Sequence, residues 1–154
     1  MIESIEVLKR LQSLKSEINE LKEYQERRKQ DVQKKKTQIE DKKALAEEKH
    51  EEKLSRQKEI DRKELDLKTD EGEITKYNVQ LNSIKTNKEY TALCTEIGSK
   101  KADMSILEDE ILNTMSRLES VNEEYNRLQE DLRREEESLK VLIESVDADV
   151  RKTD

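Results

Sequence analysis

Two residues of this chain belong to types that often do chemistry in enzymes and metal sites, and each is the only one of its kind. His50 is the single histidine and lies among glutamates, and Cys94 is the single cysteine. A zinc site takes several nitrogen or sulfur ligands, and a cysteine nucleophile needs a neighbouring base or cation to lower its pKa. Because the neighbouring sequence meets neither requirement, we expect a solvated His50, a half-buried Cys94, no metal site, no cofactor and no enzymatic activity.

The basic residues suggest a different chemistry, because a row of them can bind a polyanion. Six recur at intervals of seven in the first half of the chain: Arg28, Lys35, Lys42, Lys49, Arg56 and Lys63. One interpretation is a stripe that binds nucleic acid. The interpretation that we favour is that their aliphatic stems cover apolar neighbours in a coiled coil while the charged ends reach acids on a partner helix. The net charge of −7 argues against a chain that binds polyanions along its whole length.

The composition limits the elements that can position these residues. Of 154 residues, 45% are charged and 31% are hydrophobic, none is Pro and two are Gly. A compact domain needs more apolar volume, which leaves disorder or long helices with a narrow apolar stripe. The chain contains no run of about 20 apolar residues, which is the length that a membrane-spanning helix needs. The N-terminal residues are acidic, whereas a signal peptide has a basic start. The lone cysteine cannot build a disulfide framework. We therefore expect a cytoplasmic location.

Apolar residues recur every seven positions in two long series, which favours helix over disorder. Nine of the eleven positions in the first series are apolar: Leu11, Ile18, Gln25, Val32, Ile39, Ala46, Lys53, Ile60, Leu67, Ile74 and Leu81. All nine are apolar in the second: Tyr90, Ile97, Met104, Ile111, Leu118, Tyr125, Leu132, Leu139 and Val146. A heptad repeat of this length predicts a coiled coil.

The two series are out of register with each other, and the sequence between them carries a helix-start signal. Thr86 and Glu89 have the spacing of a capping box. We therefore predict an all-α fold, a long antiparallel two-helix coiled-coil hairpin with its turn near Asn87. The first helix is expected over 1–84, the tip over 85–89 and the second helix over 90–154, with Gly72 as a soft spot or kink. The alternative is a stutter inside one continuous helix.

An antiparallel hairpin can be tested by arithmetic, because facing seam residues must have numbers with a constant sum. A sum of 174 pairs apolar residues throughout: Ile84 with Tyr90, Leu81 with Leu93, Leu67 with Leu107, Ala46 with Leu128 and Val32 with Leu142. Near the same axis, the basic run 34–36 falls opposite residues 135–139, which begin with three glutamates, and Lys42 and Lys43 fall opposite residues 130–132. Opposite charges beside a seam help to set the orientation of the partner helix.

The N-terminal part of the first helix has an apolar stripe that this axis leaves without a partner. On the axis, Leu21 faces residue 153, whereas Leu14 and Leu11 would face positions 160 and 163, which lie beyond Asp154. The stripe comprises Ile5, Leu8, Leu11, Leu14, Ile18 and Leu21. Because such a stripe is poorly suited to water, we expect either self-association into a homodimer through Leu8, Leu11, Leu14, Ile18 and Leu21, or a natural protein that continues beyond Asp154.

A family resemblance rests on the segment around the predicted turn. Residues 81–93 read LNSIKTNKEYTAL, with Glu96-Ile97 next and LEDEIL at 107–112. This segment resembles the bacterial proteins that join a coiled-coil hairpin to a C-terminal zinc ribbon with two Cys-x-x-Cys pairs. The present chain has no such pairs, so zinc is expected only if a ribbon follows in the full-length protein. The resemblance implies an adapter or chaperone-like role, with links to transcription factors, secretion or flagellar assembly, and nucleic acid.

The predicted tip is specified beyond the needs of a turn. Capping explains part of it, but not the two lysines. We expect the tip to bind a protein partner through Lys85, Thr86, Asn87, Lys88, Glu89 and Tyr90. The alternatives are a nucleic-acid binder that uses the basic stripe, and a structural dimerisation rod.

Overall fold

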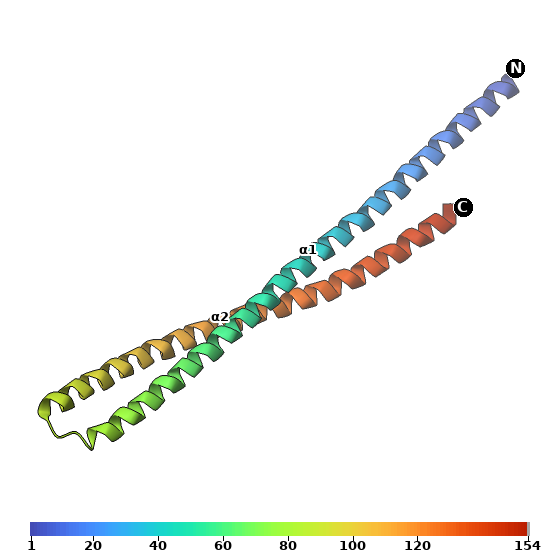
Figure 1. Ribbon diagram of the computed structural model, residues 1–154. Coiled ribbons are helices and arrows are strands. Elements are labelled where there is room, and N and C mark those ends of the chain that lie inside the picture. Colours follow the sequence, from blue (N-terminus) through green and yellow to red (C-terminus); the bar gives the residue numbers. More distant parts are fainter. Residues whose placement is uncertain (154) are drawn as a thin grey trace. The chain divides into compact units, whose positions relative to one another are not determined.

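The computed structural model describes the backbone of residues 1–153 and the side chains of residues 1–151, and confirms an all-α helical hairpin. Helix α1 spans Ile2–Leu81 and helix α2 spans Asn87–Thr153. The contacts divide the chain into two units: unit 1 is Met1–Ala46 with Arg127–Asp154, and unit 2 is Glu47–Asn126. Within each unit a segment of α1 packs antiparallel to a segment of α2 (Figure 1). Among the described residues, no helical stretch is long and apolar enough to cross a bilayer.

Each unit buries one narrow seam, because its helices are apolar on a single stripe. The core of unit 1 includes Ile39, Ala46, Leu132 and Val146. The core of unit 2 consists of Ile60, Ile97, Ile111, Val121 and the one buried polar residue among those described, Thr114. The protected positions repeat every three and four residues along both helices, and from residue 25 to residue 81 the first heptad series is buried or half-buried at every position. The heptad pattern therefore identified the packed face.

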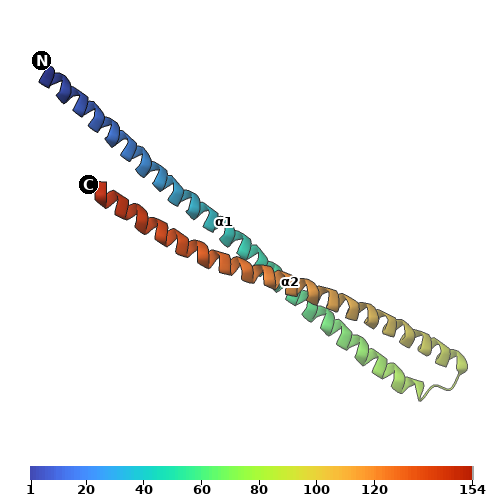
Figure 2. The same ribbon diagram turned by 180° about the vertical axis from the view of Figure 1, so that it is seen from behind.

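The pairing register agrees with the axis predicted from the sequence. In unit 2, Lys49 Nζ lies 2.7 Å from Glu124 Oε2, and Lys63 Nζ lies 3.3 Å from Glu110 Oε2. Across the ion pairs between α1 and α2 in the described part of the chain, the two residue numbers add to between 170 and 179, with a mean of 174. The reverse view shows the same antiparallel course of α1 and α2 within unit 2 (Figure 2).

The connection between the helices comprises residues 82–86, three positions earlier than the predicted tip. Helix α1 ends in a tighter turn, in which backbone hydrogen bonds span three residues: the N–H groups of Asn82 and Ser83 donate to the carbonyls of Val79 and Gln80, respectively. The Ser83 hydroxyl also donates to the Gln80 carbonyl, so α1 ends without a glycine or a left-handed residue. Helical structure continues through Gly72.

One predicted core residue is not buried. Tyr90 begins the second heptad series, yet 52% of it is exposed. Its counterpart on the axis is Ile84, which lies in the connection and not in a helix. Because no helical surface faces Tyr90 there, the core of α2 begins with the half-buried Leu93 and the buried Ile97.

Candidate functional site

The start of α2 is organised by one side chain at the tip. Thr86 Oγ1 accepts a hydrogen bond from the Glu89 N–H at 3.3 Å, and the Thr86 carbonyl accepts the Tyr90 N–H at 3.1 Å. These two contacts are those of an N-cap residue, which satisfies an amide that would otherwise lack a helical partner. The predicted cap is therefore confirmed at Thr86, and it explains why α2 begins at Asn87 rather than at residue 90.

The remaining tip residues are presented to solvent. All six residues of the predicted site are exposed: Lys85, Thr86, Asn87, Lys88, Glu89 and Tyr90. Neither Lys85 nor Lys88 forms an ion pair with another described residue. The tip therefore brings together two lysines and a half-exposed aromatic ring within six residues, next to a connection that is itself mostly polar.

The basic residues of the seam are arranged differently, since each is half-buried and contacts an acid. Arg28, Lys35, Lys42, Lys49 and Lys63 reach acids on α2, and Arg56 contacts Glu52 and Glu59 on its own helix. Five of the six charged ends therefore meet acids of the partner helix, as the favoured interpretation predicts, and Arg56 meets acids of its own helix instead. One predicted pairing is wrong in detail. Lys42 and Lys43 contact Glu135 and Glu136, a few residues beyond the predicted segment, while Glu130 contacts Arg133 and Arg134.

These ion pairs shift the pKa values of their members in the direction that favours the charged forms. The hydrogen bond to Glu124 raises the pKa of Lys49, and the hydrogen bond from Lys35, with help from Lys42, lowers the pKa of Glu135. The pKa of Lys63 is raised by its contact with Glu59 and, to a lesser extent, with Glu110. Opposite charges at hydrogen-bond distance have this effect, and it opposes the effect of burial.

Sequence reasoning missed one cation of the seam, on α2. Lys100 Nζ lies 2.7 Å from Glu73 Oε2 and 3.7 Å from Asp70 Oδ1, and the contact with Glu73 raises the pKa of Lys100. The heptad spacing could have identified it, because Lys100 falls three residues after Ile97 and so on the seam. Asp70 likewise falls three residues after Leu67. A search for polar residues at seam positions of both helices would have paired them.

The prediction that His50 is solvated is wrong. His50 is half-buried, its ring centroid lies 5.8 Å from that of Tyr125, and its Nδ1 is buried with no hydrogen-bond partner among the described residues. The Tyr125 ring also contacts a cation: Lys53 Nζ lies over it, 4.7 Å from the ring centroid. The cause is the antiparallel register, which places residue 125 beside residues 49–53. Lys53, one of the two polar positions in the first heptad series, is thereby accommodated by a cation–π contact.

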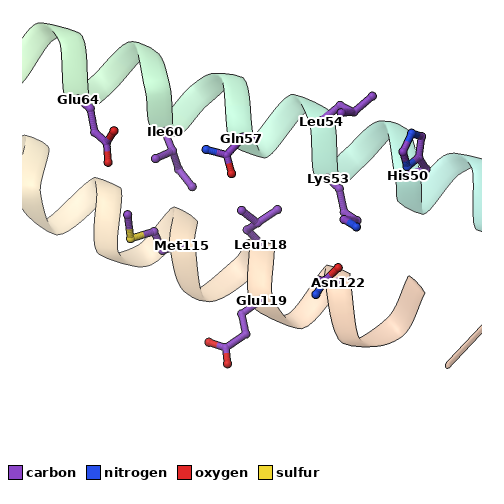
Figure 3. Close-up of a pocket in the computed structure, with 10 residues that line it drawn as sticks. All are labelled: His50, Lys53, Leu54, Gln57, Ile60, Glu64, Met115, Leu118, Glu119 and Asn122. Carbon is purple, nitrogen blue, oxygen red and sulfur yellow. The ribbon is translucent and has the colours of Figure 1, made fainter. Parts of the chain in front are cut away.

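A shallow groove runs along the same flank of unit 2 (Figure 3). It has a volume of about 610 Å³ and is lined from α1 by His50, Lys53, Leu54, Gln57, Ile60 and Glu64, and from α2 by Met115, Leu118, Glu119 and Asn122. Its walls combine Leu54, Met115 and Leu118 with separate polar groups. An open groove of this kind does not remove a charged group from water, as a catalytic pocket must.

The remaining residues singled out in the sequence lie on the surface. Cys94 is exposed rather than half-buried, because it follows the seam position Leu93 close to the end of the packed region. In the described part of the chain, no three His, Cys, Asp or Glu residues are placed to hold one metal ion. The residues of the predicted self-association stripe, Leu8, Leu11, Leu14, Ile18 and Leu21, are all exposed.

Known proteins were compared with the chain at the level of sequence families, curated sequences and solved structures. The segment at 81–112 that resembles the coiled-coil zinc-ribbon family lies at the end of α1, across the connection and in the first part of α2. The resemblance therefore rests on that short motif. No family model, no curated protein and no solved structure matches this chain.

Proposed function

We propose that this protein is a non-enzymatic binding module that docks the tip of its hairpin, residues 85–90, onto a protein partner. One observation carries the proposal. The tip exposes Lys85, Lys88 and Tyr90 together, and neither lysine takes part in an ion pair within the described part of the chain. In the same unit, Lys49, Lys63 and Lys100 are occupied by acids of the hairpin itself.

The chemistry of the tip suggests the chemistry of the partner. Tyrosine is enriched among the residues that contribute most to protein interfaces, because it supplies a large apolar surface at a small entropy cost. The ring of Tyr90 is suited to a shallow apolar pocket. Lys85 and Lys88 are suited to carboxylates at the rim of that pocket, where complementary charge speeds association and helps to select the partner. The expected partner surface is therefore acidic around an apolar depression.

The resemblance to the coiled-coil zinc-ribbon family suggests the setting in which such a partner is found. It favours an adapter or chaperone-like role in transcription or in secretion and flagellar assembly. The single exposed cysteine suits a reducing compartment such as the cytoplasm. Both assignments are proposals that identification of the partner would test.

Nucleic-acid binding is the competing hypothesis, and the ion pairs of the seam weigh against it. Phosphate binding by Lys35, Lys49 or Lys63 would compete with the carboxylates that these side chains already contact. A polyanion would also approach acids that flank the same seam. If binding occurred through this stripe, its affinity would fall steeply with salt concentration.

A photocrosslinking experiment tests the proposed tip. We replace Tyr90 with the photoreactive residue p-benzoylphenylalanine and irradiate cells that naturally make the protein. One discrete protein adduct is expected, and it should be lost when Lys85→Glu and Lys88→Glu are added. Because these positions lie outside the seam, the melting temperature should change little.

Two matched controls make the result specific. The same photoreactive residue at Leu65, which is 65% exposed, should give no such adduct. Reversal of two exposed lysines elsewhere in unit 2, Lys76→Glu with Lys101→Glu, should leave the Tyr90 adduct intact. Equal adducts at positions 65 and 90, or an adduct that survives reversal at the tip, would rule out tip-specific binding. Salt-sensitive binding of labelled DNA that Lys85→Glu leaves unchanged would favour the nucleic-acid hypothesis.

A further inference from the structure

We propose that residues 2–21 of α1 pair antiparallel with the same segment of a second copy of this chain, in the register in which Leu11 faces Leu14. This inference is independent of the proposed tip function. It starts from the exposed apolar surface of unit 1. Seven apolar side chains of residues 5–21 have exposed fractions between 46% and 59%: Ile5, Val7, Leu8, Leu11, Leu14, Ile18 and Leu21.

Most of these side chains continue the seam that α1 uses inside unit 1. The half-buried or buried positions at 25, 28, 32, 35 and 39 alternate by three and four residues. The same alternation, extended towards the N-terminus, reaches Leu21, Ile18, Leu14, Leu11 and Val7. Among the described residues, the polar contact between α1 and α2 that lies nearest the N-terminus joins the Tyr24 hydroxyl to Asp149 at 3.3 Å. Residues 5–21 thus present a coiled-coil seam to solvent, which is unfavourable for this much apolar surface.

The charges beside the seam identify a second copy as the occupant. In an antiparallel pair, facing seam residues have numbers with a constant sum, and a sum of 25 places Leu11 opposite Leu14 and Ile18 opposite Val7. Arg10 and Glu17 each directly precede a seam residue and lie on the same flank. In this register Arg10 of each copy meets Glu17 of the other. The two-fold symmetry of the pair produces this contact twice.

Other registers lose this complementarity. A shift of one heptad in either direction brings Glu17 against Glu17 or Arg10 against Arg10. A parallel pair places Arg10 beside Lys15 of the other copy. In the proposed register the like-charged approach is that of the two Lys15 side chains, on the outer flank, where solvent and salt screen it. Charge patterns beside a coiled-coil seam select partner and orientation in this way.

Sedimentation equilibrium of the 154-residue chain tests the pairing. Between about 5 and about 200 µM, we expect a reversible monomer–dimer equilibrium, since self-association depends on chain concentration. Leu11→Lys with Ile18→Lys should weaken the dimer at least about 100-fold, because two seam layers then hold charges. The matched control, Leu65→Lys with Val79→Lys, changes two exposed apolar residues outside the stripe and should leave the dissociation constant within about threefold. A parent chain that stays monomeric over this range, or a control that weakens the dimer equally, overturns the proposal.

Charge exchange tests the register separately from stability. Arg10→Glu and Glu17→Arg should each weaken the dimer about tenfold, because each places like charges across the seam twice. The two substitutions together restore opposite charges and should return the dissociation constant to within about threefold of the parent. If Arg10→Glu alone strengthens the dimer, the pairing is parallel and the proposal is wrong.

A disulfide trap gives a geometric readout that does not depend on affinity. In a Cys94→Ser background, chains carrying Leu11→Cys are mixed with chains carrying Leu14→Cys under mild oxidation. The proposed register predicts disulfides mainly between the two kinds of chain. Disulfides mainly between identical chains would indicate a parallel pair and would contradict the proposal.

Discussion

Replacement of Ile60 by Ala probes the seam at its most buried position. Ile60 is 2% exposed, lies in unit 2 and has Thr114 as its counterpart on the pairing axis. Its side chain also lines the groove shown in Figure 3, as does that of Leu118. The substitution removes three carbon groups from a position that the second helix covers and leaves the helical backbone of α1 in place.

The expected loss of stability follows from these contacts. Three buried carbon groups contribute about 2.4 kcal/mol at about 0.8 kcal/mol each. Isoleucine-to-alanine replacements in cores cost about 2–5 kcal/mol once the cavity is included. Two effects reduce this cost. A two-helix seam is open at its edges, so neighbouring side chains can move into the cavity. Ala is also the better helix former, by about 0.4 kcal/mol. We therefore expect a loss of about 2–3 kcal/mol, which lowers the melting temperature by roughly 5–10 °C.

Urea denaturation followed by circular dichroism at a fixed chain concentration measures this loss. The matched control is Leu65→Ala in the same helix, which removes as many carbons from a side chain that is 65% exposed. It should cost less than about 0.5 kcal/mol. If the two variants lose equal stability, Ile60 is not buried by α2 in solution, and the pairing of the helices in unit 2 is refuted.

Four further predictions concern other parts of the hairpin. Gly72→Ala should raise the stability in urea by about 1 kcal/mol, because nothing beyond the adjoining helical backbone lies within 4 Å of the added Cβ and Ala suits a helix interior; a loss would indicate that Gly72 acts as a hinge. Two lysines of α1 lower the pKa of Glu135 from 4.5, so its contribution to stability is present above that pH and is lost as the pH falls through the lower folded-state pKa. The melting temperature of Glu135→Gln should therefore lie below that of the parent at pH 7, and the gap should close as the pH falls well below 4.5; a gap that persists in strong acid would contradict the ion pairs. Carbodiimide should join Lys49 to Glu124 within one chain, as detected by peptide mass spectrometry, whereas a product only between chains would contradict the hairpin. Thr86→Ala should cost about 1 kcal/mol and speed hydrogen exchange at the start of α2, while Thr86→Ser should not.

Much of the fold could be predicted because its information is local and periodic. The heptad spacing marks the buried face of each helix, as Ile39, Ile60 and Ile111 illustrate. The capping signal at Thr86 marks where the second helix begins. Once the seam of each helix is known, an antiparallel pair has a single free parameter, the sum of facing residue numbers, and the apolar pattern determines it. The candidate tip followed from the same reasoning, whereas the exposure of its seam residue Tyr90 did not, because its counterpart Ile84 lies in the connection.

Local pattern was therefore enough to predict the fold class, the face of each helix that packs and the register of the pair. The packing of the helices determined which polar groups meet. It paired Lys100 with Glu73, moved Lys43 to Glu136 and brought His50 against Tyr125. The physical reason is reach: backbone periodicity places a residue on a face, whereas a long polar side chain can contact several positions on the facing helix. Its choice depends on which neighbours are already occupied, and only the packed helices determine that.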